Sequence, residues 1–253
     1  MYEWAHFRRA KGAVKLHLRL DHDGYLPDYA LITEGKRHDS MLAKAFPYSP
    51  KSITVFDKAY VDFGLFGKLC SIGAFFVTRL KDNADYSIVE KRAVPWRNTV
   101  INDWLVHFNG HYSRKKCPHT LRIVEFYDEE RDRVLRFLTN NLTLAASTIA
   151  AIYKERWAIE IFFKALKQSL KIKTFIGTIS NAVKTQIWTA LIAMLLLKYL
   201  QLKSSIGWSL SNLVALLRMN LFTYRDLWAW LDNPYITPPQ PLLEVEQIAL
   251  TLQ

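Results

Sequence analysis

The pattern of hydrophobic residues changes twice along the chain, and these changes limit the folds that the sequence can adopt. Over the first 80 residues, short strand-like runs alternate with helix-like segments. Ala13 to Leu20 alternates apolar and basic residues, which is typical of a half-buried strand, and Ile53 to Phe56 is a short β-branched run, which is typical of a buried strand. We expect a helix from Tyr60 to Cys70 and another strand from Ala74 to Thr78. This alternation predicts an α/β fold.

The rest of the chain has two further patterns. Four strand-like segments separated by turn residues follow first: Val89 to Pro95, Thr99 to Phe108, Leu121 to Tyr127 and Val134 to Leu138. Beyond Asn141 the pattern is helical, with a long helix expected from Thr143 to about Leu170 and another from Ser180 or Asn181 to about Lys203. We therefore expect residues 1–80 and 142–205 to be two parts of one domain and residues 81–141 to be an inserted β subdomain. Residues 206–253 would hold shorter helices and a proline-rich tail.

The charge balance favours a polyanionic partner. Lysine and arginine total 34 against 23 acidic residues, a formal net charge of +11, and such an excess is typical of proteins that bind nucleic acid or an anionic membrane surface. The longest apolar run, Ala190 to Leu197, ends at Lys198 and is shorter than the roughly 18 residues that span a bilayer. We interpret it as a buried helix and expect a cytoplasmic protein with no membrane partner. Cys70 and Cys117 form neither a disulfide framework nor a zinc motif.

One stripe of polar side chains stands out on the helix expected from Thr143. Drawn as a continuous helix at about 100° per residue, five side chains fall within an arc of about 80°. They are Tyr153, Arg156, Glu160, Lys164 and Lys167. A solvated face with ion pairs between successive turns is one explanation. The other is a metal site flanked by phosphates, since glutamate is a hard oxygen ligand for Mg²⁺ and arginine and lysine bind phosphate oxygens.

Four residues of this helix stand at fixed gaps within YKERWAIEIFFKALK: Tyr153, Arg156, Glu160 and Lys167. The spacing resembles the Tyr-Arg-Glu-Lys signature of prokaryotic insertion-sequence transposases of the DDE class. Asp57, within VFDKAY, resembles the second catalytic aspartate of that family, and Phe76 to Lys81 resembles the strand that follows it. The resemblance covers nearly the whole chain. It implies a ribonuclease-H-like α/β fold with a mixed sheet and a β insertion before the glutamate helix.

The resemblance also implies a chemistry, which is in-line attack on DNA phosphodiesters with two carboxylate-bound Mg²⁺ (or Mn²⁺) ions. Asp57 and Glu160 would be the catalytic residues and metal ligands. Six more side chains would bind double-stranded DNA at the element ends or the target: Tyr153, Arg156, Lys164, Lys167, Arg79 and Lys81. The pattern is compatible with a homodimer on DNA and with a nucleoid-associated protein in a prokaryotic cytoplasm.

A third carboxylate is missing from this pattern. In the family, the first aspartate lies on the first, central strand and precedes a segment like Trp4 to Gly12, but here no aspartate precedes Asp21. Asp21 and Asp23 belong to a turn, so we expect an N-terminally truncated transposase without its first strand. That loss would open a gap between the strand at Ala13 to Leu20 and the strand before Asp57. We expect this chain to be inactive alone, and the alternative is a non-catalytic DNA-binding remnant.

Overall fold

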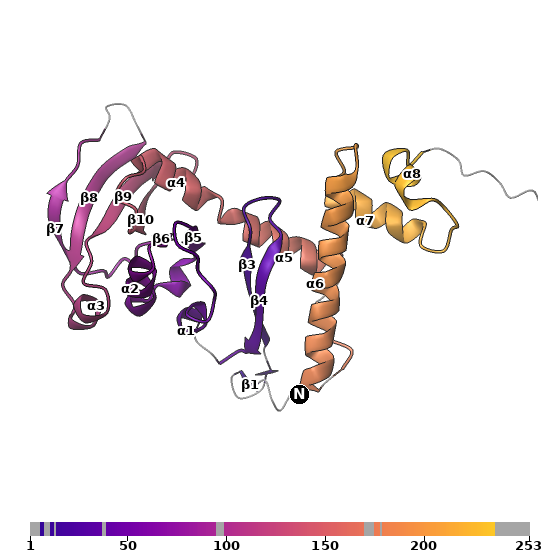
Figure 1. Cartoon of the computed structure of the whole chain (residues 1–253), viewed down its shortest axis with the longest axis horizontal. Helices are drawn as coiled ribbons and strands as arrows, with labels where there is room; N and C mark the ends of the chain where they lie inside the picture. The colour runs from indigo at the N-terminus through magenta and orange to yellow at the C-terminus, as the bar shows by residue number, and fades with distance from the viewer. Residues whose placement is uncertain are drawn as a thin grey trace, which may run out of the picture.

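The computed structural model describes residues 6–7, 11–12, 14–36, 39–94, 99–169, 175–177 and 179–235. The molecule is elongated, with a sheet at one end, a β-hairpin in the middle and a group of helices at the other end (Figure 1). A small pair of strands, β1 (His6–Phe7) and β2 (Lys11–Gly12), precedes the hairpin. The predicted segment Trp4 to Gly12 lies mostly outside the described residues.

The main sheet has six strands in the order β5-β6-β10-β9-β8-β7. β5 (Ile53–Phe56) and β6 (Phe75–Arg79) run parallel. The other neighbours are antiparallel: β7 (Tyr86–Lys91), β8 (Val100–Phe108), β9 (Leu121–Asp128) and β10 (Arg133–Thr139). The strands of the expected β insertion therefore form. They extend the same sheet as β5 and β6, because β10 pairs directly with β6.

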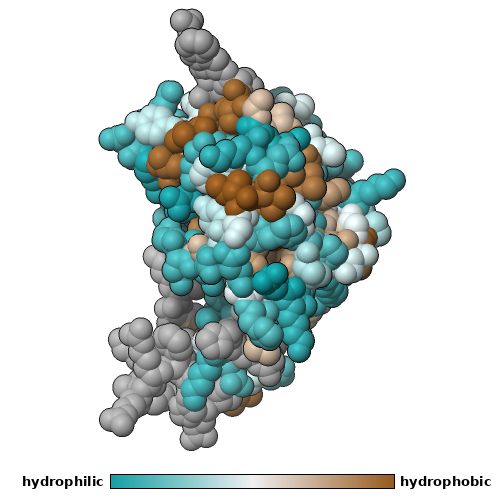
Figure 2. Space-filling view, turned by 90° about the vertical axis from the view of Figure 1, so that its left-hand side faces the viewer, coloured by the Kyte–Doolittle hydropathy of each residue, from teal (hydrophilic) through white to brown (hydrophobic). Residues whose placement is uncertain are grey.

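Alternate side chains of each strand point to opposite faces of this sheet, and helices pack against both faces. One face packs against α2 (Phe63–Ser71), with α3 (His111–Lys116) beside it. The other face packs against α4 (Ala146–Lys154). The outward surface at this end of the molecule is largely hydrophilic with scattered apolar patches (Figure 2). α3 lies in a stretch where we expected only turn residues.

β3 (Val14–Leu20) and β4 (Pro27–Glu34) form a separate two-stranded sheet. The apolar side chains of β3 pack on α5 (Trp157–Ser169) and α6 (Ser180–Lys203). Among the described residues, no strand pairs with β5 on the side away from β6. β5 is thus an edge strand, and Ile53 is 39% exposed, so the expectation of a buried strand is wrong there. β3 and β5 therefore belong to separate sheets, and the expected gap left by a missing first strand lies between these two strands.

The single helix expected from Thr143 to Leu170 is broken into α4 and α5. The turn at Glu155 and Arg156 is held by short-range bonds, since the amides of Arg156 and Ala158 donate to the carbonyls three residues earlier, at 3.1 and 3.0 Å. α4 belongs to the core of the six-stranded sheet, whereas α5 belongs to the core of the hairpin and α6. Because α4 and α5 pack in different cores, Tyr153 and Glu160 are not on one continuous helix. The predicted arc of polar side chains is therefore wrong between these two residues.

The remaining helices are α1 (Asp39–Ala43), before β5, and α7 (Leu210–Met219) and α8 (Leu227–Asp232), which follow α6. Within the described residues, α6 is the one helix long and apolar enough to cross a membrane by length and composition. Only 22% of its most apolar 18-residue stretch is buried, and the buried residues lie along one face, so the predicted buried helix is buried on one side only. The tail beyond Tyr235 lies outside the described residues.

Candidate active site

Asp57 immediately follows β5 and begins a short 3₁₀-helix, η2 (Lys58–Tyr60). Its Oδ1 accepts a hydrogen bond from the amide of Ala59 at 3.0 Å, which is an N-cap that fixes the carboxylate at the strand end. The other oxygen, Oδ2, lies 3.3 Å from Nη1 of Arg156. The side chain of Asp57 is 48% exposed. Asp57 therefore both caps η2 and presents a carboxylate to solvent.

Glu160 lies in the first turn of α5 and shares its partner with Asp57. Its Oε1 is 2.8 Å from Nη2 of Arg156, so one guanidinium contacts carboxylates that are 103 residues apart in the chain. Burial would lower the pKa of Arg156, but its hydrogen bond to Glu160 and the neighbouring Tyr153 outweigh that effect and raise it. The structure thus brings the two predicted metal ligands together at one cation.

Tyr153 supports Arg156 from the sheet side. Its ring packs 4.8 Å from that of Phe137, and the guanidinium of Arg156 lies 5.7 Å from the centre of the Tyr153 ring. Burial is the main reason that the pKa of Tyr153 is raised, and nearby Asp57 adds to the effect against the opposing charge of Arg156. Tyr153 is therefore a neutral hydroxyl at physiological pH. It is a buried residue of α4, whereas we expected a residue of an exposed stripe.

Arg79 is the last residue of β6, and Lys81 follows it two residues later. Because Phe56 pairs with Thr78, Arg79 is the neighbour of Asp57 across the parallel pair, and its charge acts on Tyr153. Lys81 lines a separate hollow of about 240 Å³ together with residues of β8 and α3. Arg79 therefore joins the cluster around Asp57, whereas Lys81 belongs to another surface.

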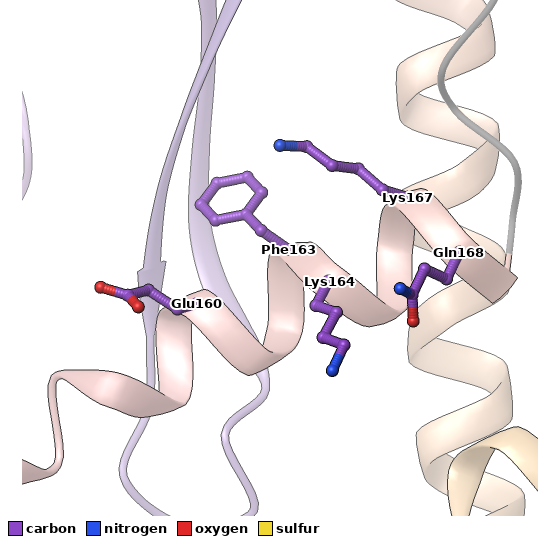
Figure 3. A pocket seen from close by; sticks show the side chains of 5 residues that line it. All are labelled: Glu160, Phe163, Lys164, Lys167 and Gln168. Atoms are coloured by element: carbon purple, nitrogen blue, oxygen red, sulfur yellow. The ribbon is translucent and has the colours of Figure 1, made fainter.

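Lys164 and Lys167 follow Glu160 along α5. The three side chains, with Phe163 and Gln168, line an open hollow of about 500 Å³. Glu160, Phe163 and Lys167 project to one side of the helix, and Lys164 and Gln168 project to the other (Figure 3). Both lysines are exposed. The hollow therefore offers one carboxylate and two cations to a ligand, which suits phosphate groups bound beside a metal.

A buried polar chain that the sequence did not reveal fixes η2 from the hairpin. His17 of β3 is 3% exposed, with Nδ1 3.1 Å from the hydroxyl of Tyr60 and Nε2 3.1 Å from that of Thr33. Burial is the main reason that the pKa of His17 is lowered. Lys15 of the same strand pairs with Asp39 at 2.9 Å. In the sequence, the motif VFDKAY, which contains both Asp57 and Tyr60, was the feature that could have pointed to Tyr60.

Two carboxylates at one place suit a divalent cation, because their joint negative charge exceeds the single charge of Arg156 and carboxylate oxygens are the preferred ligands of Mg²⁺. Across the residues that the structure describes, no group of three His, Cys, Asp or Glu side chains is placed to hold a metal. Asp21 and Asp23 lie at the turn between β3 and β4, where the amide of Asp23 is 3.4 Å from Oδ1 of Asp21. They do not supply a third ligand to this pair.

Comparison with known proteins places this geometry in a family. The model of the transposase DDE domain matches residues 4–196. The y4zB protein of Sinorhizobium fredii, named as a transposase, is 31% identical over 239 residues, which are 93% of this chain and 67% of that protein. A transposase named for insertion sequence element IS5377 of Geobacillus stearothermophilus is 31% identical over 82% of this chain and 55% of its own length. A shorter match, 46% identical over 59 residues, is to a protein named for element IS4SA of Synechocystis.

The chain thus spans about two thirds and about half the length of the first two relatives. The family match covers the six-stranded sheet and the hairpin. It also covers Asp57, Glu160 and Arg156, the guanidinium that both carboxylates contact. The mixed α/β architecture agrees with a ribonuclease-H-like DDE fold. The chain belongs to the DDE transposase domain family and is related to insertion-sequence transposases.

Proposed function

We propose that this chain is the catalytic part of an insertion-sequence transposase, which cleaves and joins DNA at the ends of a mobile element. One observation carries the proposal: Asp57 and Glu160, which come from a strand end and a helix of different cores, meet at a single guanidinium. Enzymes of this family generally depend on divalent metals. Asp57 and Glu160 would hold Mg²⁺ or Mn²⁺, and the bound ion would polarise the scissile phosphodiester and lower the pKa of an attacking water or hydroxyl.

The surrounding residues have separate roles in this proposal. Arg156 bridges the two carboxylates and offsets part of their charge, and it would bind a DNA phosphate once a cation takes its place. Tyr153, whose pKa is raised mainly by burial, packs its ring against the guanidinium of Arg156. Lys164 and Lys167 line the hollow next to Glu160 and would bind phosphates of the same strand, as Arg79 would from the β6 side. Lys81 would contact DNA only at the separate hollow that it lines.

The two-ion chemistry needs more negative ligands than this pair supplies. Two cations about 4 Å apart repel each other strongly, and at least three carboxylates are typical of sites that hold both. The unpaired edge of β5 lies next to Asp57, so a further strand at that edge would bring its own side chains to the pair. We therefore expect the 253-residue chain alone to cleave DNA at a rate close to background.

The test is cleavage of a plasmid that carries this coding segment with its flanking DNA. We expect the chain alone to be nearly inactive, and a version extended at its N-terminus by an aspartate-bearing strand from a full-length relative to nick the element ends in Mg²⁺. In the extended version, Glu160→Gln should reduce cleavage at least a hundredfold, because misplaced or missing catalytic groups cost at least that much. Glu155→Gln changes an exposed carboxylate one turn away and should retain activity. Cleavage that survives Glu160→Gln would refute the proposal.

The second candidate is a non-catalytic DNA-binding function, which the count of two carboxylates and the net charge of +11 both favour. In this case the chain would bind duplex DNA through phosphates, with log K falling against log salt at a slope near −5 for about six contacts. The same salt slope is expected of the transposase. An inactive extended version that still binds DNA would therefore favour this second candidate.

A further inference from the structure

The two cysteines of the chain lie far apart in the sequence and meet between α2 and α3. Cys70 is in the last turn of α2, and Cys117 is the residue that ends α3. The two helices lie beside each other on one face of the main sheet (Figure 1). A Cβ added at Gly67 would lie 3.6 Å from the Cα of Cys117. Because Gly67 and Cys70 are three positions apart on the same helix face, this close approach brings the two thiols together.

The sulfur of Cys70 accepts hydrogen bonds from two different elements. The S–H of Cys117 donates to it, and Nδ2 of Asn140, directly after β10, donates to it at 3.4 Å. Asn140 is itself fixed, because Nδ2 also donates to the carbonyl of Ala74 at 2.8 Å and Oδ1 accepts from the amide of Phe76 at 2.9 Å. Donors held in this way stabilise the negative charge of a thiolate on Cys70.

The two thiols differ in acidity and in access to solvent. The hydrogen bond from Cys117 is the main reason that the pKa of Cys70 is lowered, and Asn140 and His119 add to this effect against the opposing effect of burial. The same hydrogen bond, together with burial, raises the pKa of Cys117. Cys70 is partly exposed, whereas Cys117 is buried. Cys70 is therefore an accessible thiolate, and Cys117 is a protonated thiol held behind it.

We propose that Cys70 and Cys117 are a peroxide-sensitive thiol pair, in which Cys70 attacks the oxidant and Cys117 completes a disulfide. The Cys70 thiolate attacks one oxygen of hydrogen peroxide, the O–O bond breaks, and the leaving hydroxide takes a proton from solvent to become water. The sulfur of Cys117 then attacks the Cys70 sulfenic acid, its proton goes to the leaving hydroxyl, and a second water departs. Two thiols are thus oxidised by two electrons, and one peroxide is reduced to two waters.

The disulfide would join the last turn of α2 to the end of α3, two helices that cover the same face of the sheet. A cross-link that closes a long loop stabilises the folded state, mainly by restricting the unfolded chain. In a reducing compartment the bond would be transient, because cellular thiols reduce it again. The inference uses neither Asp57 nor Glu160 and is independent of whether the chain cleaves DNA.

The first test is treatment of the reduced 253-residue chain with a small excess of hydrogen peroxide. Peptide mass mapping should find Cys70 linked to Cys117, with two hydrogens lost from the chain, and dithiothreitol should restore both thiols. The oxidised chain should melt roughly 5–10 °C higher than the reduced chain. In Cys117→Ser the reaction should stop at a sulfenic acid on Cys70, which dimedone traps, whereas Cys70→Ser should give no dimedone adduct.

Alkylation of the unsubstituted chain with iodoacetamide tests the two roles without any variant. In the native chain Cys70 should react about tenfold faster than Cys117, or more. In concentrated urea the two rates should be similar, because the contacts that set the difference are lost. Three results would overturn the inference: both thiols surviving peroxide, oxidation of Cys70 to a sulfinic acid while Cys117 stays free, and alkylation of Cys117 as fast as that of Cys70 in the native chain. Disulfide-linked dimers in place of the internal bond would overturn it as well.

Discussion

The most informative stability experiment concerns a buried ion pair between β8 and β9. Arg122 is 2% exposed and forms two 2.7 Å hydrogen bonds to the carboxylate of Asp103. Its Nη1 also donates to the carbonyls of Asn141 and Leu144, at 3.3 and 2.6 Å. These carbonyls lie directly before α4, so the pair fixes the start of the helix that carries Tyr153. Asp103→Ala would leave a buried guanidinium with two carbonyl partners and no counter-charge.

The expected loss follows from these contacts. Removing one partner of a buried pair costs about 3–5 kcal/mol of unfolding free energy, because the remaining charge is uncompensated. The matched control is the pair of Arg19 and Asp28, which has the same chemistry and a 2.7 Å contact but is partly exposed. Asp28→Ala should cost at most about 1 kcal/mol. The double substitution Asp103→Leu with Arg122→Met should lose less than Asp103→Ala, since no charge remains buried.

The measurement is urea unfolding followed by circular dichroism, with the free energies compared between variants. Asp103→Ala should shift the midpoint strongly, and Asp28→Ala should shift it little. Equal losses from Asp103→Ala and Asp28→Ala would refute the reasoning that burial, rather than the salt bridge itself, sets the cost. A double variant as unstable as the single one would contradict the second part of the argument.

Two further predictions follow from the packing. Gly67→Ala should destabilise the fold by about 1–3 kcal/mol, because an added Cβ would lie 2.1 Å from the carbonyl oxygen of Lys116. The control is Gly207→Ala, which should be nearly neutral in thermal melts because nothing lies within 4 Å of its Cβ position. Similar melting temperatures for the two variants would refute the clash at Gly67. The lowered pKa of buried His17 means that the unfolded chain binds the proton first, so unfolding free energy should fall as pH drops below about 6.5. His17→Asn should flatten that decline in urea titrations at several pH values, and an unchanged slope would show that other groups cause it.

Much of the fold follows from local pattern. β5 and α6 begin and end almost where the sequence predicts, and the last three of the four strands expected between residues 81 and 141 form close to their predicted bounds. The first, expected from Val89 to Pro95, begins earlier as β7 at Tyr86 and ends at Lys91, and Pro95 lies outside the described residues. Ser180 and Lys203 bound α6, where a helix was expected from Ser180 or Asn181 to about Lys203. These elements were predictable because strand and helix periods depend on neighbours close in sequence.

The errors come from contacts that local pattern does not contain. The break after Lys154 arises because α4 and α5 pack in different cores, and a helical wheel has no information about which core each turn will join. The exposure of Trp188 has a similar origin, since α6 has more apolar surface than the described fold covers. The burial of Arg122 in β9 was also hidden, because its partner Asp103 lies 19 residues away on another strand.

The candidate site was predictable in its residues and not in its arrangement. The spacing around Glu160 and the segment around Asp57 were sufficient to select both carboxylates before any contact was known. That Arg156 contacts both, and that Lys81 lies on another surface, depends on the register of β5 and β6 and on the turn between α4 and α5. Such relations arise only when the two cores are assembled.

The proposed metal site at Asp57 and Glu160 is tested most directly by Mn²⁺ binding. Titration calorimetry on the 253-residue chain, with electron paramagnetic resonance to count bound ions, should show a Mn²⁺ site that is weakened at least tenfold by Asp57→Asn and by Glu160→Gln. Glu155→Gln, which alters an exposed carboxylate of the same segment, should leave the affinity unchanged. Mn²⁺ binding that is indifferent to both Asp57→Asn and Glu160→Gln would contradict the account.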